Sequence, residues 1–585
     1  MKFNVSKRKQ LIGVITVLGL IGPIIPVKAV AQVDPTIASN NQNYIKIEAE
    51  DYLSTMGKVS ITQNLPGYSG SGYLDIAIPN APVDRPDTTG ATKLTDLQDG
   101  VSWQVYVPKA GRYKINYVYN NPATESNHWR NARDERNMRV TLNSKWVGWV
   151  IFSKSGEFGN GNWNNNPIFV DLKAGKNILT LQMEAPPGQA VYDGPNIDYF
   201  TVTPDKELIP EKKIPYFEGK FAHPGVYYKK ADLDLMKKEA LSSGDNIWKR
   251  GFQQIMADPK SSLSYQSKPS QLVERGPYNN PNIGADNMLN DAVAAHNDAL
   301  IWYVTGNEAY AKKAIEIMNG WSYTLKDITN NDARLLVAMT SQDIVNAAEI
   351  IRHCYNTDPA ITAENKWQEK DIAQFEGMLR NVYYKTIKDF YPQANGNWDA
   401  LMTSAMMEMG VFLDDTNMFN RALRQFYRGD AVGDGTASMG SIASYIYPTG
   451  EAQESNRDQV HNGMGLDGLS FSAEVAWNQG LDLYKAYHNR LAVGSNYNAQ
   501  YNLQAIDPTV PNVKSDTYIS DKSKGTASAV VEIIANHYTN EVENANVKIP
   551  FTLRSAIELK REAHNSYTDA FKFERLPKKD EDTSK

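Results

Sequence analysis

The sequence predicts a multidomain protein in which a β-sandwich is followed by an all-α domain. Three observations support this fold class. The chain has 585 residues, which is more than one hydrophobic core usually organises. Apolar residues alternate with polar ones in many short runs over residues 44–204, and they recur with a helical period from about residue 222 onward.

The N-terminus predicts a secretory signal peptide over residues 1–31. A basic start precedes an apolar run over residues 11–25, and the small residues 29–31 follow it as a cleavage site. The alternative is a membrane anchor. Pro23 and Pro26 end the run before the ~20 apolar residues that a spanning helix needs, so we expect cleavage and a secreted, extracellular protein.

Composition excludes several function classes. The net charge of −6 argues against a nucleic-acid partner, since such proteins neutralise phosphates with excess positive charge. The single cysteine, Cys354, excludes an intramolecular disulfide and a thiolate zinc cage. Phosphate-binding loops, dinucleotide fingerprints and His-Glu-x-x-His motifs are absent, so we expect no cofactor for catalysis. No second segment resembles a membrane span, so no membrane partner is expected after cleavage.

The first half reads as short strands. Residues 44–50 and 101–107 alternate most clearly, and turns rich in glycine and lysine separate the later runs. Many short strands at this spacing indicate a β-sandwich. Residues 205–220 are charged, contain prolines and lack a period, and are expected to be a linker.

The second half, residues 221–572, reads as successive amphipathic helices. Apolar stripes occur over residues 289–303, 310–321, 338–351, 398–412 and 469–484. A helical series of this length suits an α/α toroid or a solenoid, and the absence of a fixed repeat favours the toroid. Residues 573–585 are expected to be a charged tail.

Carboxylates at the two ends of the first half suggest a metal site. Glu48 and Glu50 are two residues apart on the first strand and so point to one face. If the first and last strands pair, Asp198 can join them, and oxygen ligands of this kind suit Ca²⁺. A solvated strand face is the other explanation.

Three motifs in this half resemble carbohydrate-binding modules of the family 6 and 35 type. They are Ile-Glu-Ala-Glu-Asp-Tyr at 47–52, Gly-Ser-Gly-Tyr-Leu-Asp at 70–75 and Asn-Ile-Asp at 196–198. The resemblance implies a jelly roll, a structural calcium at Glu48, Glu50 and Asp198, and a sugar site at the loop end. Asn196 matches the family's asparagine there. Trp163 and Tyr192 are candidate stacking rings, or residues packed beneath a loop.

Two polar clusters stand out in the helical half. The first, residues 395–398, contains Asn397 just ahead of an apolar stripe, where it would also serve as a helix N-cap. The second, residues 447–461, holds both charge signs and many hydrogen-bonding groups. A loop this polar between buried helices either faces solvent or lines a cleft.

These clusters resemble the alginate lyase superfamily of polysaccharide lyases. The string Gln-Glu-Ser-Asn-Arg-Asp-Gln-Val-His at 453–461 is the most specific part, and the resemblance covers most of residues 222–540. It implies an α/α toroid, an acidic polysaccharide as partner, and β-elimination on a uronic-acid polymer such as alginate or glucuronan. The substrate-binding residues expected from the clusters are Trp398, Gln453, Glu454 and Gln459.

The family reaction requires a neutralised sugar carboxylate, a base for the C5 proton and an acid for the leaving oxygen. Asn397 and His461 match family positions that face the carboxylate. Arg457 can pair with the substrate carboxylate or with Glu454.

The catalytic base is the least determined residue. The family's Arg-Gly pair corresponds to Lys524-Gly525, and Val531 stands where a catalytic tyrosine is expected. Tyr447 is the first candidate for the base and Tyr538 the second. His461 is the third, because its ordinary pKa lies near working pH.

Two other functions stay open. Glu451, Glu454 and Asp458 could supply the carboxylate pair of a glycoside hydrolase. Val531 keeps open a non-catalytic polysaccharide-binding protein. His296 is expected to be a core histidine, and His353 beside Cys354 to be packing rather than a nucleophile pair. The sequence does not determine the polymer, the cleavage mode or the oligomeric state.

Overall fold

The computed structural model describes residues 44–57, 59–76, 99–121, 135–155, 161–183, 194–433, 437–515, 518–540 and 547–575. The predicted signal peptide and Tyr192 lie outside the described residues. Residues 43–585 form one compact unit.

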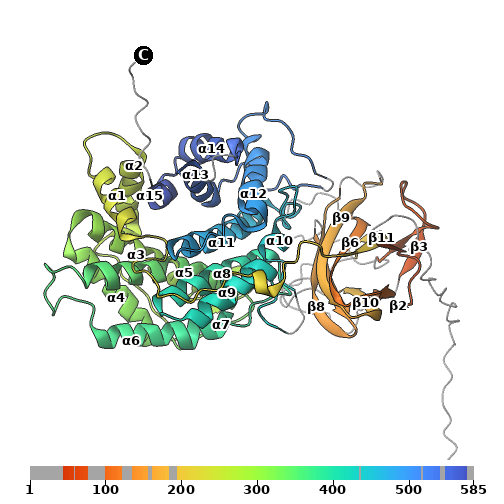
Figure 1. Ribbon diagram of the computed structural model, residues 1–585, viewed down its shortest axis with the longest axis horizontal. Helices are drawn as coiled ribbons and strands as arrows, with labels where there is room; N and C mark the ends of the chain where they lie inside the picture. The colour runs from red at the N-terminus through yellow and green to blue at the C-terminus, as the bar shows by residue number, and fades with distance from the viewer. Residues whose placement is uncertain are drawn as a thin grey trace, which may run out of the picture. The chain divides into compact units, whose positions relative to one another are not determined.

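The N-terminal part is a sandwich of two antiparallel sheets (Figure 1). One sheet has the order β3-β4-β11-β6-β9, with β1 paired to β11, and the other has the order β2-β5-β10-β7-β8. The strands are β1 (Ile45–Glu48), β2 (Ser54–Met56), β3 (Ser60–Thr62), β4 (Tyr73–Asp75), β5 (Gly100–Val107), β6 (Gly111–Asn120), β7 (Glu135–Leu142), β8 (Lys145–Ser153), β9 (Asn164–Leu172), β10 (Gly175–Met183) and β11 (Asn196–Pro204).

The core of the sandwich lies between the sheets. Along β10 every second residue is buried, as expected for strands with one face inward. Trp103 and Phe200 come from opposite sheets and meet edge to face with ring centroids 5.1 Å apart. The buried indole N–H of Trp103 donates to Ala49 O at 2.9 Å, so it is not left unpaired. The predicted β-sandwich is confirmed.

The C-terminal part is largely helical. Its longer helices are α1 (Lys230–Ala240), α2 (Ile247–Ala257), α3 (Ala285–Thr305), α4 (Glu308–Thr324), α5 (Ala333–Ile350), α6 (Glu369–Met378), α8 (Gly396–Phe412), α9 (Thr416–Arg428), α11 (Gln459–Asn478), α12 (Ala486–Leu503) and α13 (Val530–Asn540). Shorter helical segments are η4 (Glu211–Lys213), η5 (Pro259–Ser261), η6 (Pro277–Asn279), η7 (Ile351–Tyr355), η8 (Leu379–Tyr384), α7 (Lys385–Ile387), α10 (Ile442–Tyr445), α14 (Pro550–Arg554), η10 (Ser555–Ala563) and α15 (Thr568–Phe573). A small sheet joins β12 (Leu272–Arg275), β13 (Asn282–Ile283) and β14 (Asp327–Thr329).

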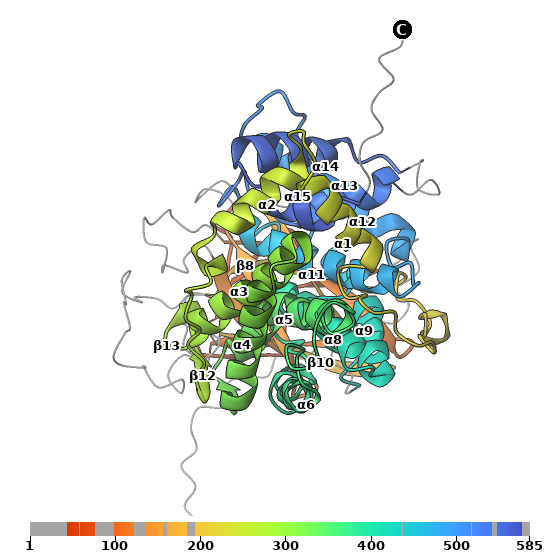
Figure 2. The ribbon, with the colours of Figure 1, turned by 90° about the vertical axis from the view of Figure 1, so that its left-hand side faces the viewer.

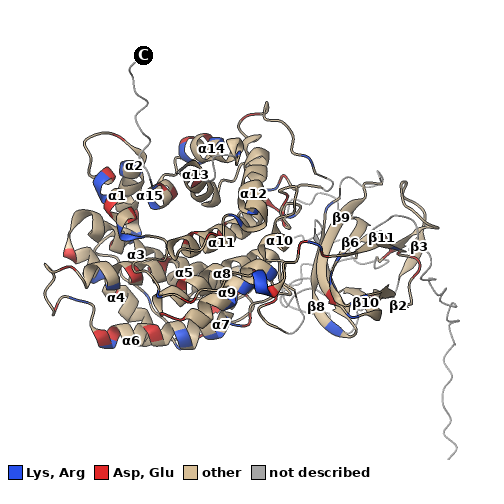
Figure 3. Cartoon of the chain, viewed as in Figure 1, with Lys and Arg blue, Asp and Glu red and all other residues tan. Residues whose placement is uncertain are grey.

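The helices follow one another in a circuit of contacts. The series α3, α5, α8 and α11 packs side by side, as Figure 2 shows. Beyond it, α11 contacts α13, α13 contacts α15, α15 contacts α2, and α2 contacts α3. Nearly every residue of α8 is buried, whereas α1 and α6 carry charged residues on their surfaces (Figure 3). The contacts support the predicted toroid, whose closure stays a prediction.

The predicted stripes fall on helices, with one break. Those over 289–303, 310–321 and 398–412 lie within α3, α4 and α8, and the stripe over 338–351 reaches from α5 into η7. The last stripe crosses the end of α11 at Asn478, because Gly480 adopts a φ of 82° and turns the chain. Leu481 and Tyr484 therefore lie beyond the helix.

The predicted start of the charged tail, at residue 573, is too early, because residues 573–575 still contact the helical part. Phe573 is buried, and Arg575 donates to Glu474 Oε1 at 2.8 Å and to Tyr227 O at 2.8 Å. Through these contacts, the chain is held against the helical part as far as Arg575. None of the described helices combines the length and apolar character that crossing a lipid bilayer demands.

Candidate active site

Asn397 and Glu454 join the two polar clusters. The Asn397 side-chain amide donates to Glu454 Oε1 at 2.8 Å and Oε2 at 2.7 Å, and its backbone N–H donates to Oε2 at 3.1 Å. Asn397 is the second residue of α8, not its N-cap; Asn395 holds that position without a side-chain bond. The Glu454 carboxylate and the Gln453 Oε1, which accepts from Gly396 N at 3.1 Å, instead satisfy the helix N-terminus.

Glu454 is the centre of this cluster. It is 1% exposed, and the Arg457 guanidinium donates to its Oε1 at 2.7 Å. The Tyr445 hydroxyl lies 3.3 Å from its Oε2. Of the two partners left open for Arg457, the structure shows Glu454. A buried carboxylate surrounded by donors is well compensated, so the arrangement is rigid.

The expectation that Asn397 faces a sugar carboxylate needs correction. Its residue exposure is 0%, and its amide group is engaged by Glu454. Its Oδ1 is buried without a hydrogen-bond partner among the described residues. Asn397 therefore holds the Glu454 carboxylate in place and does not face the site itself.

Asp458 and His461 form an adjacent pair at the start of α11. Asp458 is the N-cap: its Oδ1 accepts from His461 N at 2.8 Å, and its Oδ2 lies 2.7 Å from His461 Nδ1. Burial raises the pKa of Asp458, but hydrogen bonds from His461 and the charges of His461 and Arg457 outweigh it and hold that pKa well below its usual range. The His461 side chain is 34% exposed and Asp458 only 4%. The pair presents an oriented imidazole to solvent.

Two residues that the sequence did not single out belong here. The Tyr445 hydroxyl lies 3.2 Å from His461 O and 3.0 Å from Asn462 O, so it links the Glu454 cluster to the start of α11. Lys522, 61% exposed at its side chain, places Nζ 4.0 Å from Asp458 Oδ2. The only sequence signal for these two residues was their position in the chain. Tyr445 is two residues from Tyr447 and Lys522 is two residues from Lys524, both of which the sequence singled out.

The two tyrosines predicted as the base have contacts outside the Glu454 cluster. The Tyr447 ring lies 5.4 Å from Nζ of Lys114, on β6. Tyr538 is buried on α13, and its hydroxyl donates to Tyr484 O at 2.9 Å. Tyr445 is the last residue of α10, whereas Tyr447 lies in the loop after it, and of these two described residues only Tyr445 contacts Glu454 through its hydroxyl.

Gln459 is also not a substrate contact. It is 1% exposed, and its amide donates to Ser520 O at 2.9 Å while its Oε1 accepts from Asn498 and Asn502 at 3.2 Å. It fastens the segment before Lys522 to α11 and α12. Trp398 is half-buried with its ring centroid 5.6 Å from that of Tyr391.

The family positions for arginine and tyrosine carry different contacts. Lys524 Nζ lies 4.1 Å from the centroid of the Tyr501 ring and donates to Gln504 Oε1 at 2.8 Å. Val531 is buried at the start of α13. Neither has the chemistry of the residue expected there.

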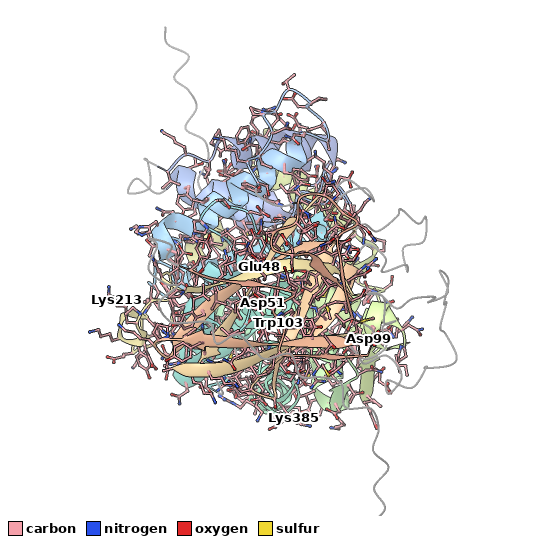
Figure 4. The ribbon with its side chains drawn as sticks, turned by 90° about the vertical axis from the view of Figure 1, so that its right-hand side faces the viewer. Glu48, Asp51, Asp99, Trp103, Lys213 and Lys385 are labelled. Carbon is pink, nitrogen blue, oxygen red and sulfur yellow. The ribbon has the colours of Figure 1, made fainter. Side chains whose placement is uncertain are left out.

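The predicted calcium ligands surround one loop of the sandwich. β1 pairs with β11, which was the condition for Asp198 to join Glu48 and Glu50; Glu48 lies opposite Tyr199, and Figure 4 labels Glu48 on this sheet. Glu48 Oε2 accepts from Ser69 Oγ at 2.7 Å, Asp198 Oδ1 from Ser69 N at 2.8 Å, and Glu50 Oε1 from Ser71 N at 2.6 Å.

These residues offer the oxygen ligands that Ca²⁺ prefers, although their carboxylate oxygens do not all lie within 4.8 Å of one another. Glu50 Oε2 is buried without a hydrogen-bond partner in the described chain. Burial, aided by the charge of Glu48, raises the pKa of Asp198 to about 6, although hydrogen bonds from Ser69 and the charge of Lys46 oppose it. Lys46 Nζ supplies one positive charge, 2.7 Å from Glu48 Oε1. A Ca²⁺ ion would be held by Glu48, Glu50 and Asp198.

The predicted sugar site is described in part. Asn196 begins β11 and pairs with Asp75 and Asn120. Trp163 donates its indole N–H to Pro66 O at 3.0 Å and meets Tyr73 edge to face at 5.3 Å. These contacts support packing for Trp163, although it stays partly exposed. Tyr192 lies outside the described residues.

Comparisons with known proteins address both parts. The N-terminal region is similar to the family 35 carbohydrate-binding module from Clostridium thermocellum, with 23% identity over 28% of this chain and 98% of that one and a TM-score of 0.20. It is also similar to the CBM35 from Paenibacillus barcinonensis, with 20% identity over 27% and 98% and a TM-score of 0.20. The sandwich assignment rests on the sheet topology itself. No curated protein matches the chain.

In the helical part, residues 254–508 match the family model described as alginate lyase. This stretch contains Asn397, Tyr445, Glu454, Arg457, Asp458 and His461. The helical part of the chain therefore carries an alginate lyase family domain, which indicates a polysaccharide lyase.

Proposed function

We propose that the protein is secreted and cleaves a uronic-acid-containing polysaccharide by β-elimination, with its sandwich acting as a carbohydrate-binding module. The observation that carries this proposal is the partly exposed His461 imidazole, held through Nδ1 by a buried, ionised Asp458. The alginate lyase family domain over residues 254–508 supports the class of substrate.

His461 is the proposed general base. Asp458 accepts the hydrogen bond from Nδ1–H, which leaves the lone pair on Nε2 as the proton acceptor. Nε2 takes the C5 proton of the uronate, the C4–C5 double bond forms, and the C4–O bond breaks. The protonated imidazole then returns its proton to the departing oxygen, so one residue serves both steps. The Asp458 carboxylate stabilises the imidazolium between them.

Positive charge around the pair lowers the cost of removing the C5 proton. Lys522 is exposed near Asp458, and Arg457 belongs to the same segment as His461. The exposed Lys522 ammonium is the proposed group that stabilises the negative charge developing on the sugar carboxylate, because the Arg457 charge is paired with Glu454. Asn397, Glu454 and Tyr445 act as positioning residues, because they hold the Arg457 side chain and the start of α11 from within the fold.

The sandwich would hold the enzyme on its polymer. The proposed calcium, bound by Glu48, Glu50 and Asp198, would fix the Ser69–Ser71 loop beside Asn196 and the loop-end sugar site. The signal sequence over residues 1–31 supports export to the medium where such polymers occur.

The experiment is incubation of the mature protein with a panel of uronate polymers, including alginate and glucuronan. The ultraviolet absorbance of the new C4–C5 double bond should grow together with new chain ends. New reducing ends without that absorbance would indicate a hydrolase. Binding without any new ends would indicate a non-catalytic protein. Asp458, with its low pKa, is poorly suited to be the acid that hydrolysis requires.

A further inference from the structure

A second polar cluster lies where the segment before α1 meets the end of α5. It consists of His223 from that segment, Glu349 on α5 and His353 in η7. Each offers one ligand atom, and these atoms lie within 4.8 Å of one another. Among the described residues, this is the one set of three His, Cys, Asp or Glu that meets this distance. It shares no residue with the His461 site.

The two histidines face one carboxylate. Their rings stack with centroids 4.1 Å apart and an angle of 11° between planes. His223 Nδ1 lies 2.7 Å from Glu349 Oε1, and His353 Nε2 lies 3.7 Å from Glu349 Oε2. The two nearly parallel rings thus each bring one nitrogen near an oxygen of Glu349. An imidazole binds a metal in the plane of its ring, so one ring must rotate out of the stack for both nitrogens to reach one ion.

The second of these contacts is unsatisfied. The Glu349 side chain is 2% exposed, and both its Oε2 and the Nε2 of His353 are buried without a hydrogen-bond partner. A separation of 3.7 Å is too long for a hydrogen bond. Leaving a buried carboxylate oxygen and a buried ring nitrogen unpaired is costly. The same separation is near the ~3.3 Å that separates two ligands in a tetrahedral zinc site with bonds of about 2.0–2.1 Å.

The surroundings are those of a metal ligand set. Asp414 Oδ1 lies 3.3 Å from His223 Nε2, on the ring edge opposite Glu349. Without an ion, both ring nitrogens of His223 contact carboxylates, and Nδ1–H donates to Glu349 Oε1 at 2.7 Å. An ion that binds Nδ1 displaces that proton, while Asp414 keeps accepting from Nε2–H, which is the outer-shell arrangement common for metal-bound histidine. Gly225 N donates to Glu349 Oε1 at 3.0 Å and fixes the carboxylate. The side chains of His223 and His353 are 15% and 22% exposed, so the cluster lies close to the protein surface although its unpaired ligand atoms are buried.

We propose that His223, Glu349 and His353 bind a divalent transition-metal ion of the Zn²⁺ class. Two imidazoles and one carboxylate suit zinc and its neighbours rather than Ca²⁺, which prefers oxygen ligands. The ion joins the segment that opens the helical part to the end of α5. Its role is to stabilise this junction, and the elimination chemistry at His461 does not depend on it.

The test uses the full mature chain without a histidine tag, stripped of metal. Zn²⁺ is titrated by calorimetry, Co²⁺ is followed by its visible absorption, and thermal unfolding is measured with and without Zn²⁺. We expect one ion per chain, a Co²⁺ spectrum of low coordination number and a higher unfolding temperature with Zn²⁺. His353→Phe keeps the stacked ring but removes a ligand, and should weaken Zn²⁺ binding by ~100-fold or more. Asp414→Asn should weaken it by about 10-fold.

His564→Ala is the matched control, because His564 is exposed and lies outside the cluster. It should bind Zn²⁺ like the wild type. Circular dichroism shows whether His353→Phe is folded, and Glu349→Gln, which retains the volume of Glu349, is the second variant if it is not. The proposal is overturned if the wild type takes up no Zn²⁺, or if a folded His353→Phe or Glu349→Gln protein binds it with unchanged affinity.

Discussion

Asn397 donates its side-chain amide to both carboxylate oxygens of Glu454, at 2.8 and 2.7 Å. The two residues are 57 positions apart, one at the start of α8 and the other in the polar loop before α11. Their contact assigns Asn397 to the support of the site. It also places a buried negative charge beneath Arg457, which is held at 2.7 Å by the same carboxylate.

Asn397→Ala should lower both stability and activity. The substitution removes two donors from the buried Glu454, so we expect a loss of about 1–3 kcal/mol in the free energy of unfolding. Activity should fall mainly through kcat, because Arg457 is repositioned while most polymer contacts stay. Denaturant unfolding and steady-state kinetics measure the two effects. A variant with wild-type stability and kinetics would show that the contact has no positioning role.

His461→Gln should abolish most turnover while leaving the fold intact. His461 is partly exposed, and loss of a general base typically costs ~10²–10⁴ in rate. Asp458→Asn should also lose activity, because the imidazole loses its orienting carboxylate. His564→Ala serves as the control and should retain full activity. Turnover by His461→Gln at the wild-type rate would remove His461 from the mechanism.

Tyr445→Phe and Tyr447→Phe make a matched pair. Each removes one hydroxyl from a tyrosine of the same segment, but the Tyr445 hydroxyl alone lies within 3.3 Å of Glu454. We expect a clear loss of activity for Tyr445→Phe and near wild-type activity for Tyr447→Phe. The reverse ranking, measured by the ultraviolet assay, would restore Tyr447 as the base.

Glu408→Gln should stabilise the protein increasingly as pH rises. Burial raises the pKa of Glu408 to about 8, and the charge of Asp343 adds to this, whereas the Tyr227 hydrogen bond opposes it. An unfolded glutamate ionises near ~4.3. Between these values the unfolded chain releases a proton that the folded chain keeps, so the wild type loses stability as pH rises.

The Glu408→Gln variant has no ionisable group at this position, so it does not show this loss of stability with rising pH. The unfolding temperature of Glu408→Gln relative to the wild type should therefore rise between about pH 5 and 8 and then level off. Differential scanning fluorimetry over this range measures the difference. If the unfolding temperatures of the variant and the wild type differ by the same amount at about pH 5 and pH 8, a raised pKa at Glu408 is contradicted.

Calcium should stabilise the sandwich through Glu50. Ca²⁺ should raise the unfolding temperature of the wild type, and a chelator should reverse the effect. Glu50→Gln should abolish most of the shift, because it removes one charge from the ligand set. Glu218→Gln, at an exposed position outside the sandwich, should respond like the wild type. An equal Ca²⁺ shift in both variants would exclude Glu50 as a ligand.

The sequence by itself determined the sandwich, most of the helices and the polar loop that supplies Glu454, Arg457, Asp458 and His461. Strand alternation and helical stripes are patterns within short segments. The secondary structure that they predict depends mainly on the residues of the same segment. The pairing of β1 with β11 entered the sequence argument only as the condition of the calcium site, and the structure supplied it.

The tertiary structure alone decided which residues of these segments meet. The Asn397 side chain points inward to Glu454, and Gln459 is buried beside Asn498 and Asn502. The tyrosine whose hydroxyl contacts Glu454 is Tyr445, not Tyr447. His223 reaches Glu349 across 126 positions. No local period encodes such contacts, because a period gives the buried face of a helix but not which residue of a distant segment packs against that face.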